Sequence, residues 1–274
     1  MLVVEAHGAR IPAIGLGTMT LKESLAVEIV EQALRVGYRH LDTAQMYGNE
    51  REVGEGLRHS GVPRNQVFVT TKVAWQRFHA DDLRRSVDES LERLELPTVD
   101  LLLLHWPNPN VPLAETIGAL CKVKTDGLAR NIGVSNFTVA LIGDALTVAT
   151  EPLVCDQVEC HPFLDQSKVL TACRNHGMAL VAYSPLARGQ FRRNEVLNRI
   201  GAAHQKTAAQ ICLRYLVQQD IVVIPRSSKL ERLTENASLF DFTLSEAEMA
   251  EIAGLASPEG RTVDWAYSGR MKWD

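Results

Sequence analysis

The sequence predicts an α/β protein of the (β/α)8 class, a closed TIM barrel with a short N-terminal β-hairpin, formed by residues 1–274 as a single domain. Three observations favour this fold. Short apolar runs alternate with segments of helical periodicity along the chain. Several runs, Leu101–Leu104 above all, are apolar at every position, which is typical of parallel strands buried on both faces. Polar residues follow many of these runs, and the chain exceeds the roughly 250 residues that such a barrel needs.

Strands are expected at the apolar runs that are rich in β-branched residues. The eight barrel strands are expected at Ile14–Thr18, Tyr38–Thr43, Val67–Lys72, Val99–His105, Asn131–Ser135, Val154–Glu159, Ala179–Ser184 and Ile221–Pro225. Ahead of them, Leu2–Ala6 and Arg10–Ala13 flank Gly8 and predict a small hairpin.

Amphipathic helices are expected between the strands. Ser24 is expected to cap the first helix, which Gly37 ends, and Asp81 or Asp82 is expected to open another. Further helices are expected near Leu113–Thr125, Val139–Thr150, Gln166–His176, Thr207–Gln218 and Ser245–Ala256.

The positions of the reactive residues favour a closed barrel over an open, doubly wound sheet. Such residues end six different expected strands or follow them directly: Asp42, Lys72, His105, Ser135, Gln157 and Ser184. In a barrel all strand ends converge on one mouth. In an open sheet, strands far from the switch point would not reach a common site. We therefore expect one site at the carboxyl ends of the strands.

Composition excludes several classes of function. Hydrophobic residues make up 46% and charged residues 23%, and the formal net charge of -4 leaves no basic excess for nucleic acid or an acidic membrane surface. The five cysteines form no C-x-x-C pair, which argues against disulfides and a zinc site. No apolar stretch reaches the length of about 18 residues needed to span a membrane, and residues 1–11 lack a signal peptide. We expect a cytoplasmic monomer that binds no metal.

Asp42, Tyr47, Lys72 and His105 together suggest proton transfer. A free tyrosine has a pKa near 10, and bringing that of Tyr47 near neutrality needs about 4 kcal/mol of phenolate stabilisation. An ammonium about 4 Å away supplies roughly that much at an effective dielectric near 20. Lys72 is the candidate, Asp42 would keep it charged, and His105 would orient a carbonyl. Taken singly, each residue also fits an ordinary role at a barrel rim, as a helix cap or in packing.

At these residues the sequence resembles the aldo-keto reductase family. The first signature is matched by residues 37–44, 47–50 and 53–54, the second by Ile132–Phe137, and the third by Ile224–Ser227 followed by Arg232, Glu235 and Asn236. The resemblance extends from Ile11 to about Leu255. It implies a TIM-barrel oxidoreductase in which Asp42, Tyr47, Lys72 and His105 are catalytic, with Tyr47 as the general acid.

The resemblance also implies NADPH as cofactor. The implied binding residues are Ser135, Asn136 and Gln157 at the nicotinamide carboxamide, Tyr183 beneath its ring, Ser184, Pro185, Leu186 and Gly189 along the pyrophosphate, Arg226, Ser227 and Arg232 at the 2′-phosphate, Glu235 and Asn236 near the adenine, and Thr18 near ribose or substrate. Gly17, Asp42 and Pro225 are further implied cofactor residues. Planar guanidinium groups match phosphate oxygens well, which favours NADPH over NADH. The family more often has lysine at position 226; arginine keeps the charge, and only the ratio of NADPH to NADH use stays open. Gly15-Leu16-Gly17 lacks the third glycine of a Rossmann fingerprint.

The substrate pocket is expected to be open and permissive. Trp75 and Trp106 are expected to wall it, beside His105 and Tyr47, with Met19 and Met46 as softer contacts. The loop Trp106–Pro112 and the tail after Leu255 are short. In this respect, and in the ending Ser257–Gly260 with Trp265 beyond, the chain is similar to bacterial reductases that act on 2,5-diketogluconate.

The predicted activity is NADPH-dependent reduction of aldehydes, ketones or small dicarbonyls to alcohols. Two alternatives remain. One is a Schiff-base lyase or aldolase in which Lys72 is the nucleophile, and the other is a regulatory protein of the same fold that binds NADPH without useful turnover. Metal-dependent hydrolysis is disfavoured, because no paired histidines at ligand spacing accompany His105. The physiological carbonyl and the preferred direction stay open.

Overall fold

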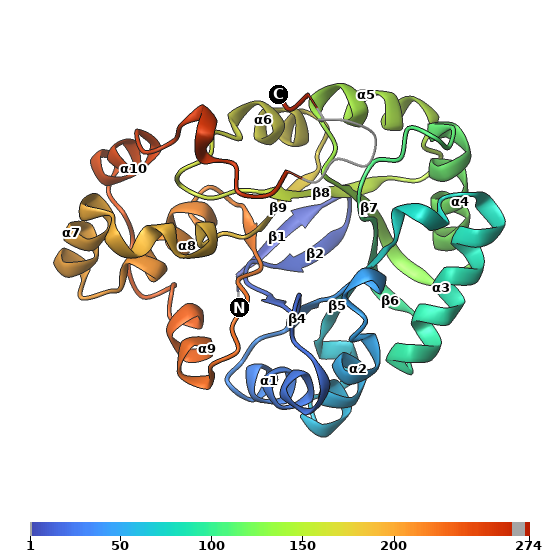
Figure 1. Ribbon diagram of the computed structural model, residues 1–274, viewed down its shortest axis with the longest axis horizontal. Coiled ribbons are helices and arrows are strands. Elements are labelled where there is room, and N and C mark those ends of the chain that lie inside the picture. Colours follow the sequence, from blue (N-terminus) through green and yellow to red (C-terminus); the bar gives the residue numbers. More distant parts are fainter. Residues whose placement is uncertain (1, 265–271) are drawn as a thin grey trace.

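Parallel strands close into a barrel in the computed structural model, which describes residues 2–264 and 272–274 (Figure 1). The eight strands are β3 (Leu16–Gly17), β4 (His40–Asp42), β5 (Phe68–Val73), β6 (Val99–Leu104), β7 (Ala129–Ser135), β8 (Leu153–Glu159), β9 (Ala179–Tyr183) and β10 (Val222–Val223). Neighbours in the sequence are neighbours in the sheet, and every pair is parallel. The predicted TIM-barrel class is confirmed.

The barrel closes between its two shortest strands, β3 and β10. Parallel bridges join Ile14 to Val223 and Gly17 to Arg226, and the amide of Gly15 donates to the carbonyl of Val223 at 2.8 Å. Because this seam is formed by isolated bridges, β3 and β10 are shorter than the runs expected from the sequence.

The predicted hairpin plugs the amino end of the barrel. Strands β1 (Val3–Ala6) and β2 (Ala9–Pro12) pair antiparallel. His7 and Gly8, which connect them, both have positive φ angles of 47° and 84°, as a two-residue hairpin turn requires. Figure 1 shows this hairpin inside the ring of strands.

Strand β6 shows how the strands are buried on both faces. Leu101 and Leu103 pack with Ile11 of the hairpin and Val222 inside the barrel. The alternate residues of β6, Leu102 and Leu104, belong to the apolar layer between the strands and the surrounding helices. The continuous apolar run therefore follows from the two-sided burial of a parallel strand.

Helices surround the barrel (Figure 1). They are α1 (Glu23–Arg35), α2 (Glu50–His59), α3 (Ala80–Leu94), α4 (Leu113–Thr125), α5 (Val139–Val148), α6 (Ser167–Asn175), α7 (Glu195–His204), α8 (Ala208–Val217), α9 (Leu230–Ala237) and α10 (Glu246–Ala253), with 3-10 turns at Gln45–Tyr47, Arg64–Gln66, Trp75–Arg77, Ala187–Arg193 and Pro258–Gly260. Helices α2, α7 and α9 were not expected from the sequence. Within the described residues, no helix combines the length and the apolar character needed to cross a membrane.

Two helix starts differ from the prediction. Helix α1 begins one residue before Ser24, with Lys22 at the N-cap and no side-chain cap. Asp81 and Asp82 lie inside the first turn of α3 instead of capping it, where carboxylates still interact favourably with the helix dipole. The predicted end of α1 is confirmed, since Gly37 follows the helix with a φ of 108°.

Candidate active site

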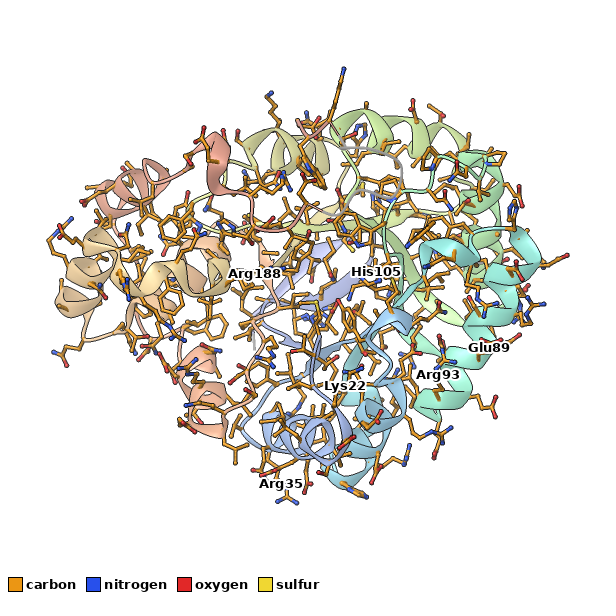
Figure 2. All side chains as sticks on the ribbon, viewed as in Figure 1. Lys22, Arg35, Glu89, Arg93, His105 and Arg188 are labelled. Carbon is orange, nitrogen blue, oxygen red and sulfur yellow. The ribbon has the colours of Figure 1, made fainter. Side chains whose placement is uncertain are left out.

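The carboxyl ends of the strands surround a cavity of about 460 Å³. In Figure 2, the labelled Lys22, His105 and Arg188 lie around the centre of the ring of helices. Thirteen residues predicted for cofactor or substrate line this cavity: Gly17, Thr18, Met19, Asp42, Tyr47, His105, Trp106, Ser135, Asn136, Gln157, Tyr183, Ser184 and Arg226. Met46 lines it as well. The structure thus brings together residues from both halves of the chain.

Lys72 lies just beneath this cavity and is fully buried. Its ammonium lies 2.5 Å from Oδ1 of Asp42, 2.9 Å from the carbonyl of Thr43 and 3.5 Å from the hydroxyl of Tyr47. An ammonium has three donors and no acceptor, so all three N–H groups have a partner. Since the Tyr47 oxygen accepts from Lys72, its own proton is free to be donated into the cavity.

The ionisation of this cluster differs in one respect from the expectation. Burial raises the pKa of Tyr47 above its ordinary value, and the charge of Lys72 only partly offsets this rise. The expected lowering of the Tyr47 pKa is therefore wrong, because removing a phenolate from water costs more than one ammonium returns. For Lys72 burial lowers the pKa, but Asp42 and Tyr47 outweigh burial and raise it overall. The phenol is protonated and the amine is charged.

The second carboxylate oxygen of Asp42 also accepts a hydrogen bond. Gln157 on β8 donates its side-chain amide to Oδ2 of Asp42 at 2.8 Å, and the backbone carbonyl of Gln157 accepts from the hydroxyl of Ser135 at 2.7 Å. One buried chain of hydrogen bonds therefore runs from β7 through β8 to β4 and fixes the carboxylate against Lys72.

His105 follows β6 and contacts Tyr47 edge to face, with ring centroids 5.5 Å apart. Burial, with a contribution from the Lys72 charge, lowers the pKa of His105 well below its ordinary value. The imidazole is therefore neutral at physiological pH and carries one N–H that can donate to a carbonyl oxygen.

Asn136 connects the histidine to the opposite wall. Its φ of 63° is left-handed, a conformation that asparagine tolerates better than most residues. Its amide donates to the carbonyl of His105 and to the hydroxyl of Ser135, both at 3.0 Å. Its carbonyl accepts from the hydroxyl of Tyr183 at 2.8 Å. The Tyr183 ring is thereby fixed at the edge of the cavity.

The loop after β9 has an unusual backbone. Ser184, Ala187, Arg188 and Gly189 have positive φ angles of 48°, 43°, 51° and 100°. Successive residues in such conformations turn backbone N–H groups toward one side, which favours anions. Ser184 and Arg188 line the cavity. Arg188 was not singled out from the sequence, although its charge within the predicted loop was a usable signal.

The remaining predicted cofactor residues do not line this cavity: Pro185, Leu186, Gly189, Pro225, Ser227, Arg232, Glu235 and Asn236. Arg232 is exposed on α9, and Glu235 accepts from the hydroxyl of Thr207 at 2.6 Å. The hydroxyl of Ser227 exchanges hydrogen bonds with the backbone of Lys229. Ser227, Arg232, Glu235 and Asn236 follow Arg226 in the sequence, and Arg226 does line the cavity.

The substrate side differs from the expectation at two places. Trp75 lies in a 3-10 turn and is not among the described residues that line the cavity, because its side chain packs against the apolar layer around the barrel. The tail also reaches the site. Val263 lines the cavity, and the Trp273 ring stands edge to face with Trp106, their centroids 6.3 Å apart. The described part of the tail therefore covers one side of the pocket that was expected to be open.

Five lining residues were not named as site residues from the sequence, Thr20, Lys22, Arg188, Ile224 and Val263. Of these, Ile224 lies in the third signature and Arg188 in the loop assigned to the pyrophosphate. Lys22 follows the end of β3 closely, and a cation at that place is a local signal. Val263 carries no such signal, because only the folded tail brings it to the barrel. Trp265 lies outside the described residues.

Comparisons with known proteins agree with this architecture. A model of the aldo/keto reductase family matches residues 13–257. The chain is 40% identical over 264 residues to methylglyoxal reductase DkgB of Escherichia coli O157:H7, covering 93% of this chain and 99% of that protein. It is 41% identical over 254 residues to glyoxal reductase of Bacillus subtilis (strain 168), covering 92% of each.

Solved structures give the same result. A structure provisionally assigned as a 2,5-diketo-D-gluconic acid reductase B superposes with a TM-score of 0.97 at 46% identity, covering 100% of this chain and 98% of that one. A Bombyx mori aldo-keto reductase in complex with NADP superposes with a TM-score of 0.87 at 32% identity, covering 93% and 92%. The family model spans most of the chain and these relatives match nearly their full length, so the protein belongs to the aldo/keto reductase family, oxidoreductases that act on carbonyl compounds.

Proposed function

We propose that this protein reduces small aldehydes, ketones and dicarbonyls to alcohols with NADPH, and that Tyr47 is the general acid. The observation that carries this proposal is the contact between the Tyr47 hydroxyl, which lines the cavity at the barrel mouth, and the buried Lys72 ammonium, 3.5 Å apart. The names of the relatives, methylglyoxal reductase and glyoxal reductase, support small dicarbonyls as substrates.

The residues around the cavity fit a dinucleotide that carries phosphates. Lys22, Arg188 and Arg226 are cations on its wall, and guanidinium groups match phosphate oxygens with two parallel donors. Buried polar side chains of Ser135 and Gln157 lie on the inner wall, where an amide would find partners. The outer residues Arg232, Glu235 and Asn236 would hold the adenosine end. When bound, NADPH supplies a hydride to the carbonyl carbon.

The protein's own residues then manage one proton. His105, a neutral donor beside Tyr47, holds the substrate oxygen, and Tyr47 protonates this oxygen as negative charge develops on it. The phenolate that remains is stabilised by the ammonium of Lys72. Asp42 keeps Lys72 charged, and Gln157 keeps Asp42 in place. Tyr47 is protonated at neutral pH and therefore carries the proton to be donated, and the Lys72 charge offsets part of the cost of burying the phenolate.

The same geometry weighs against a Schiff-base mechanism. A lysine must lose its proton to attack a carbonyl, whereas Asp42 at 2.5 Å and two further acceptors hold Lys72 as an ammonium. Reduction with Tyr47 as the acid, in contrast, requires Lys72 to be charged, which is its state in the structure.

Replacing Tyr47 by phenylalanine tests the proposal. We expect Tyr47→Phe to lower kcat for methylglyoxal about 100-fold or more, the range of general acid catalysis. The affinity for NADPH, measured by quenching of protein fluorescence, should stay unchanged because the ring is kept. The matched control is Tyr38→Phe, since the Tyr38 hydroxyl donates to the carbonyl of Leu233 and does not line the cavity. Parent-level kcat in Tyr47→Phe would refute the assignment.

A further inference from the structure

The chain after α10 returns to the barrel mouth and is held there by one carboxylate, that of Glu159. Glu159 is the last residue of β8 and is fully buried. Its Oε1 accepts from the amide of Thr262 at 2.8 Å and also from the hydroxyl of Thr262, and its Oε2 accepts from the amide of Val263 at 2.9 Å. The guanidinium of Arg261 lies 3.9 Å from Oε2. We call Glu159 with Arg261, Thr262 and Val263 the Glu159 clasp.

The clasp contains a buried negative charge. Burial alone raises the pKa of Glu159, but hydrogen bonds from His161, Thr262 and Val263 outweigh burial and lower it overall. His161 contributes through its Nε2, 3.2 Å from the carboxylate. Most of the donors that replace water around this charge therefore come from the tail. A buried carboxylate needs such partners, so Glu159 and the tail depend on each other.

The tail is also fitted to the loop after β8. The amide of Ser257 donates to the carbonyl of Phe163 at 3.2 Å. A Cβ atom built on Gly260 would lie 1.7 Å from that same carbonyl oxygen, so only glycine fits where the tail crosses this loop. The chain just before the clasp, from Ser257 to Gly260, is therefore itself anchored on the loop that contains Phe163.

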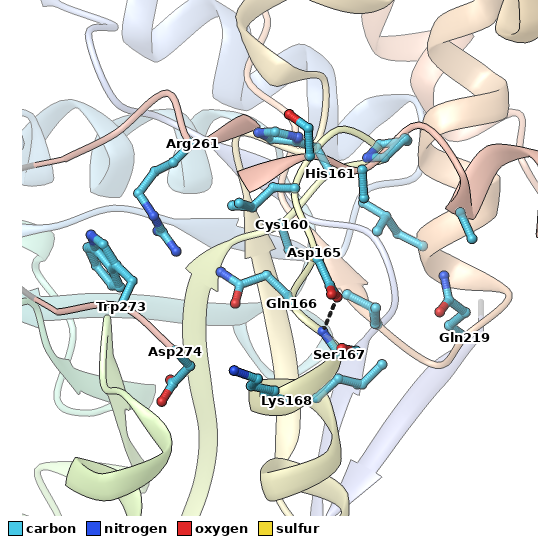
Figure 3. Close-up of a pocket in the computed structure, with 18 of the residues that line it drawn as sticks. Cys160, His161, Asp165, Gln166, Ser167, Lys168, Gln219, Arg261, Trp273 and Asp274 are labelled. Carbon is cyan, nitrogen blue, oxygen red and sulfur yellow. Dashed lines mark hydrogen bonds between the residues drawn. The ribbon is translucent and has the colours of Figure 1, made fainter. Parts of the chain in front are cut away.

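Beyond the clasp, the described end of the chain contacts the substrate side of the active site. The Arg261 guanidinium lies 3.7 Å from the centre of the Trp273 ring, and Trp273 contacts Trp106, which follows His105. Asp274 accepts from the amide of Val139 at 2.9 Å. Figure 3 shows Arg261 beside Trp273, with Asp274 below them, at the edge of a second cavity of about 980 Å³. Described tail residues therefore line both cavities, Arg261 and Trp273 the second cavity and Val263 the active site.

We propose that Glu159 is a positioning residue for the carbonyl substrate. Through Thr262 and Val263 it sets the part of the active-site wall that Val263 forms, and through Arg261 it sets the place of Trp273 against Trp106. This inference rests on the proposed function. Glu159 itself is not among the described residues that line the active-site cavity, so it acts through the tail and not by touching substrate.

The test is Glu159→Gln in the full-length protein. The amide keeps the size of the side chain but loses the charge and one acceptor oxygen. We expect KM for methylglyoxal to rise about tenfold, the lower end of what one lost pocket contact costs, while kcat and the Kd for NADPH stay at parent values. A change confined to KM indicates lost substrate binding. Glu259→Gln is the matched control, because Glu259 is an exposed acid on the same tail.

Tail-side variants test whether the effect passes through the clasp. Thr262→Val removes the hydroxyl partner of Glu159 and should raise KM in the same direction, even if Glu159→Gln fails to fold. Combined with Glu159→Gln, it should add little, because both changes break one contact. Additive effects would overturn the proposal. So would a weaker NADPH affinity without a change in KM, since Glu159 pairs in register with Tyr183 and would then act on the cofactor side.

A readout without substrate separates this inference from the proposed function. Trypsin cleavage after Arg261, followed by mass spectrometry on the protein without substrate or cofactor, should be faster in Glu159→Gln than in the parent or in Glu259→Gln. Equal cleavage rates overturn the clasp whatever the activity. An absence of carbonyl reduction in the parent, together with faster cleavage in the variant, would instead refute the proposed function and keep the clasp.

Discussion

Lys72 has a fully buried charge whose three donors all find acceptors, and this single residue explains much of the site. The arrangement is costly to form, because the ammonium and the Asp42 carboxylate both leave water. It persists because each group is satisfied, with Asp42 between Lys72 and the amide of Gln157. The ion pair therefore matters less for its net stability than for keeping Lys72 charged beside the Tyr47 hydroxyl.

At this scale we predict that Asp42→Asn strongly destabilises the protein. The change leaves the Lys72 ammonium buried without its counter-ion, which typically costs about 3–5 kcal/mol. Urea denaturation at neutral pH measures this loss. The exposed pair of Lys122 and Asp126, 2.9 Å apart, gives the control, since Asp126→Asn should cost less than about 1 kcal/mol. Equal losses in the two variants would contradict the account of the buried pair.

Among the elements, α2 shows how packing overrides local preference. Its sequence contains two glycines, which lower helix propensity, and no helix was expected there. In the structure both glycines lie where α2 meets its neighbours. A Cβ on Gly54 would lie 2.3 Å from the carbonyl oxygen of Leu94, and one on Gly56 would lie 2.7 Å from that of Val27. Close approach of α1, α2 and α3 therefore requires the residues that make the helix hard to predict.

We predict that Gly54→Ala lowers the free energy of unfolding by about 1–3 kcal/mol, the usual cost of overpacking, despite the better helix propensity of alanine. The control is Gly118→Ala in α4, where an added Cβ meets nothing within 4 Å. That change should stabilise the protein by up to about 1 kcal/mol. Thermal or urea denaturation measures the change in unfolding free energy of each variant, which should be a loss in Gly54→Ala and a gain in Gly118→Ala. Changes of the same sign in both variants would contradict the packing argument.

For the whole molecule, barrel closure buries titratable groups that the unfolded chain exposes. His40 on β4 is fully buried, with its ring against Phe68 and its Nε2 3.0 Å from the hydroxyl of Thr70. Burial lowers the pKa of His40 to about 4, whereas an exposed histidine titrates near 6.5. Below about pH 6.5, His40 therefore binds a proton in the unfolded chain but not in the folded barrel. The free energy of unfolding falls until the pH reaches about 4, below which His40 is protonated in both states.

The expected result is a loss of about 2 kcal/mol of unfolding free energy from His40 alone between about pH 7.5 and about pH 5. Urea denaturation across this range should show a smaller pH dependence in His40→Asn than in the parent. Burial also lowers the pKa of His105. His105 therefore also lowers stability as the pH falls, and part of the pH dependence should remain in His40→Asn. His59→Asn, at an exposed position, should leave the slope unchanged. An unchanged slope in His40→Asn would show that His40 does not titrate as described.

The sequence alone determined the barrel class, the N-terminal hairpin and the strand ends that surround the cavity. These follow from local physics, since apolar runs, turn residues and strand-end positions can be recognised in short windows. It also placed Asp42, Lys72 and His105 at neighbouring strand ends and Tyr47 in the loop after Asp42, because consecutive parallel strands lie side by side in a barrel.

Tertiary structure alone decided the rest. The direction of the Tyr47 pKa depends on burial, which spacing in the sequence does not show. Trp75 packs against the apolar layer outside the barrel although it follows Lys72 closely. The Glu159 clasp joins residues about a hundred positions apart, and the glycines of α2 are required only where α2 packs against α1 and α3. Each of these is a contact between distant segments, and such contacts are fixed by the packing of the whole barrel and not by any local pattern.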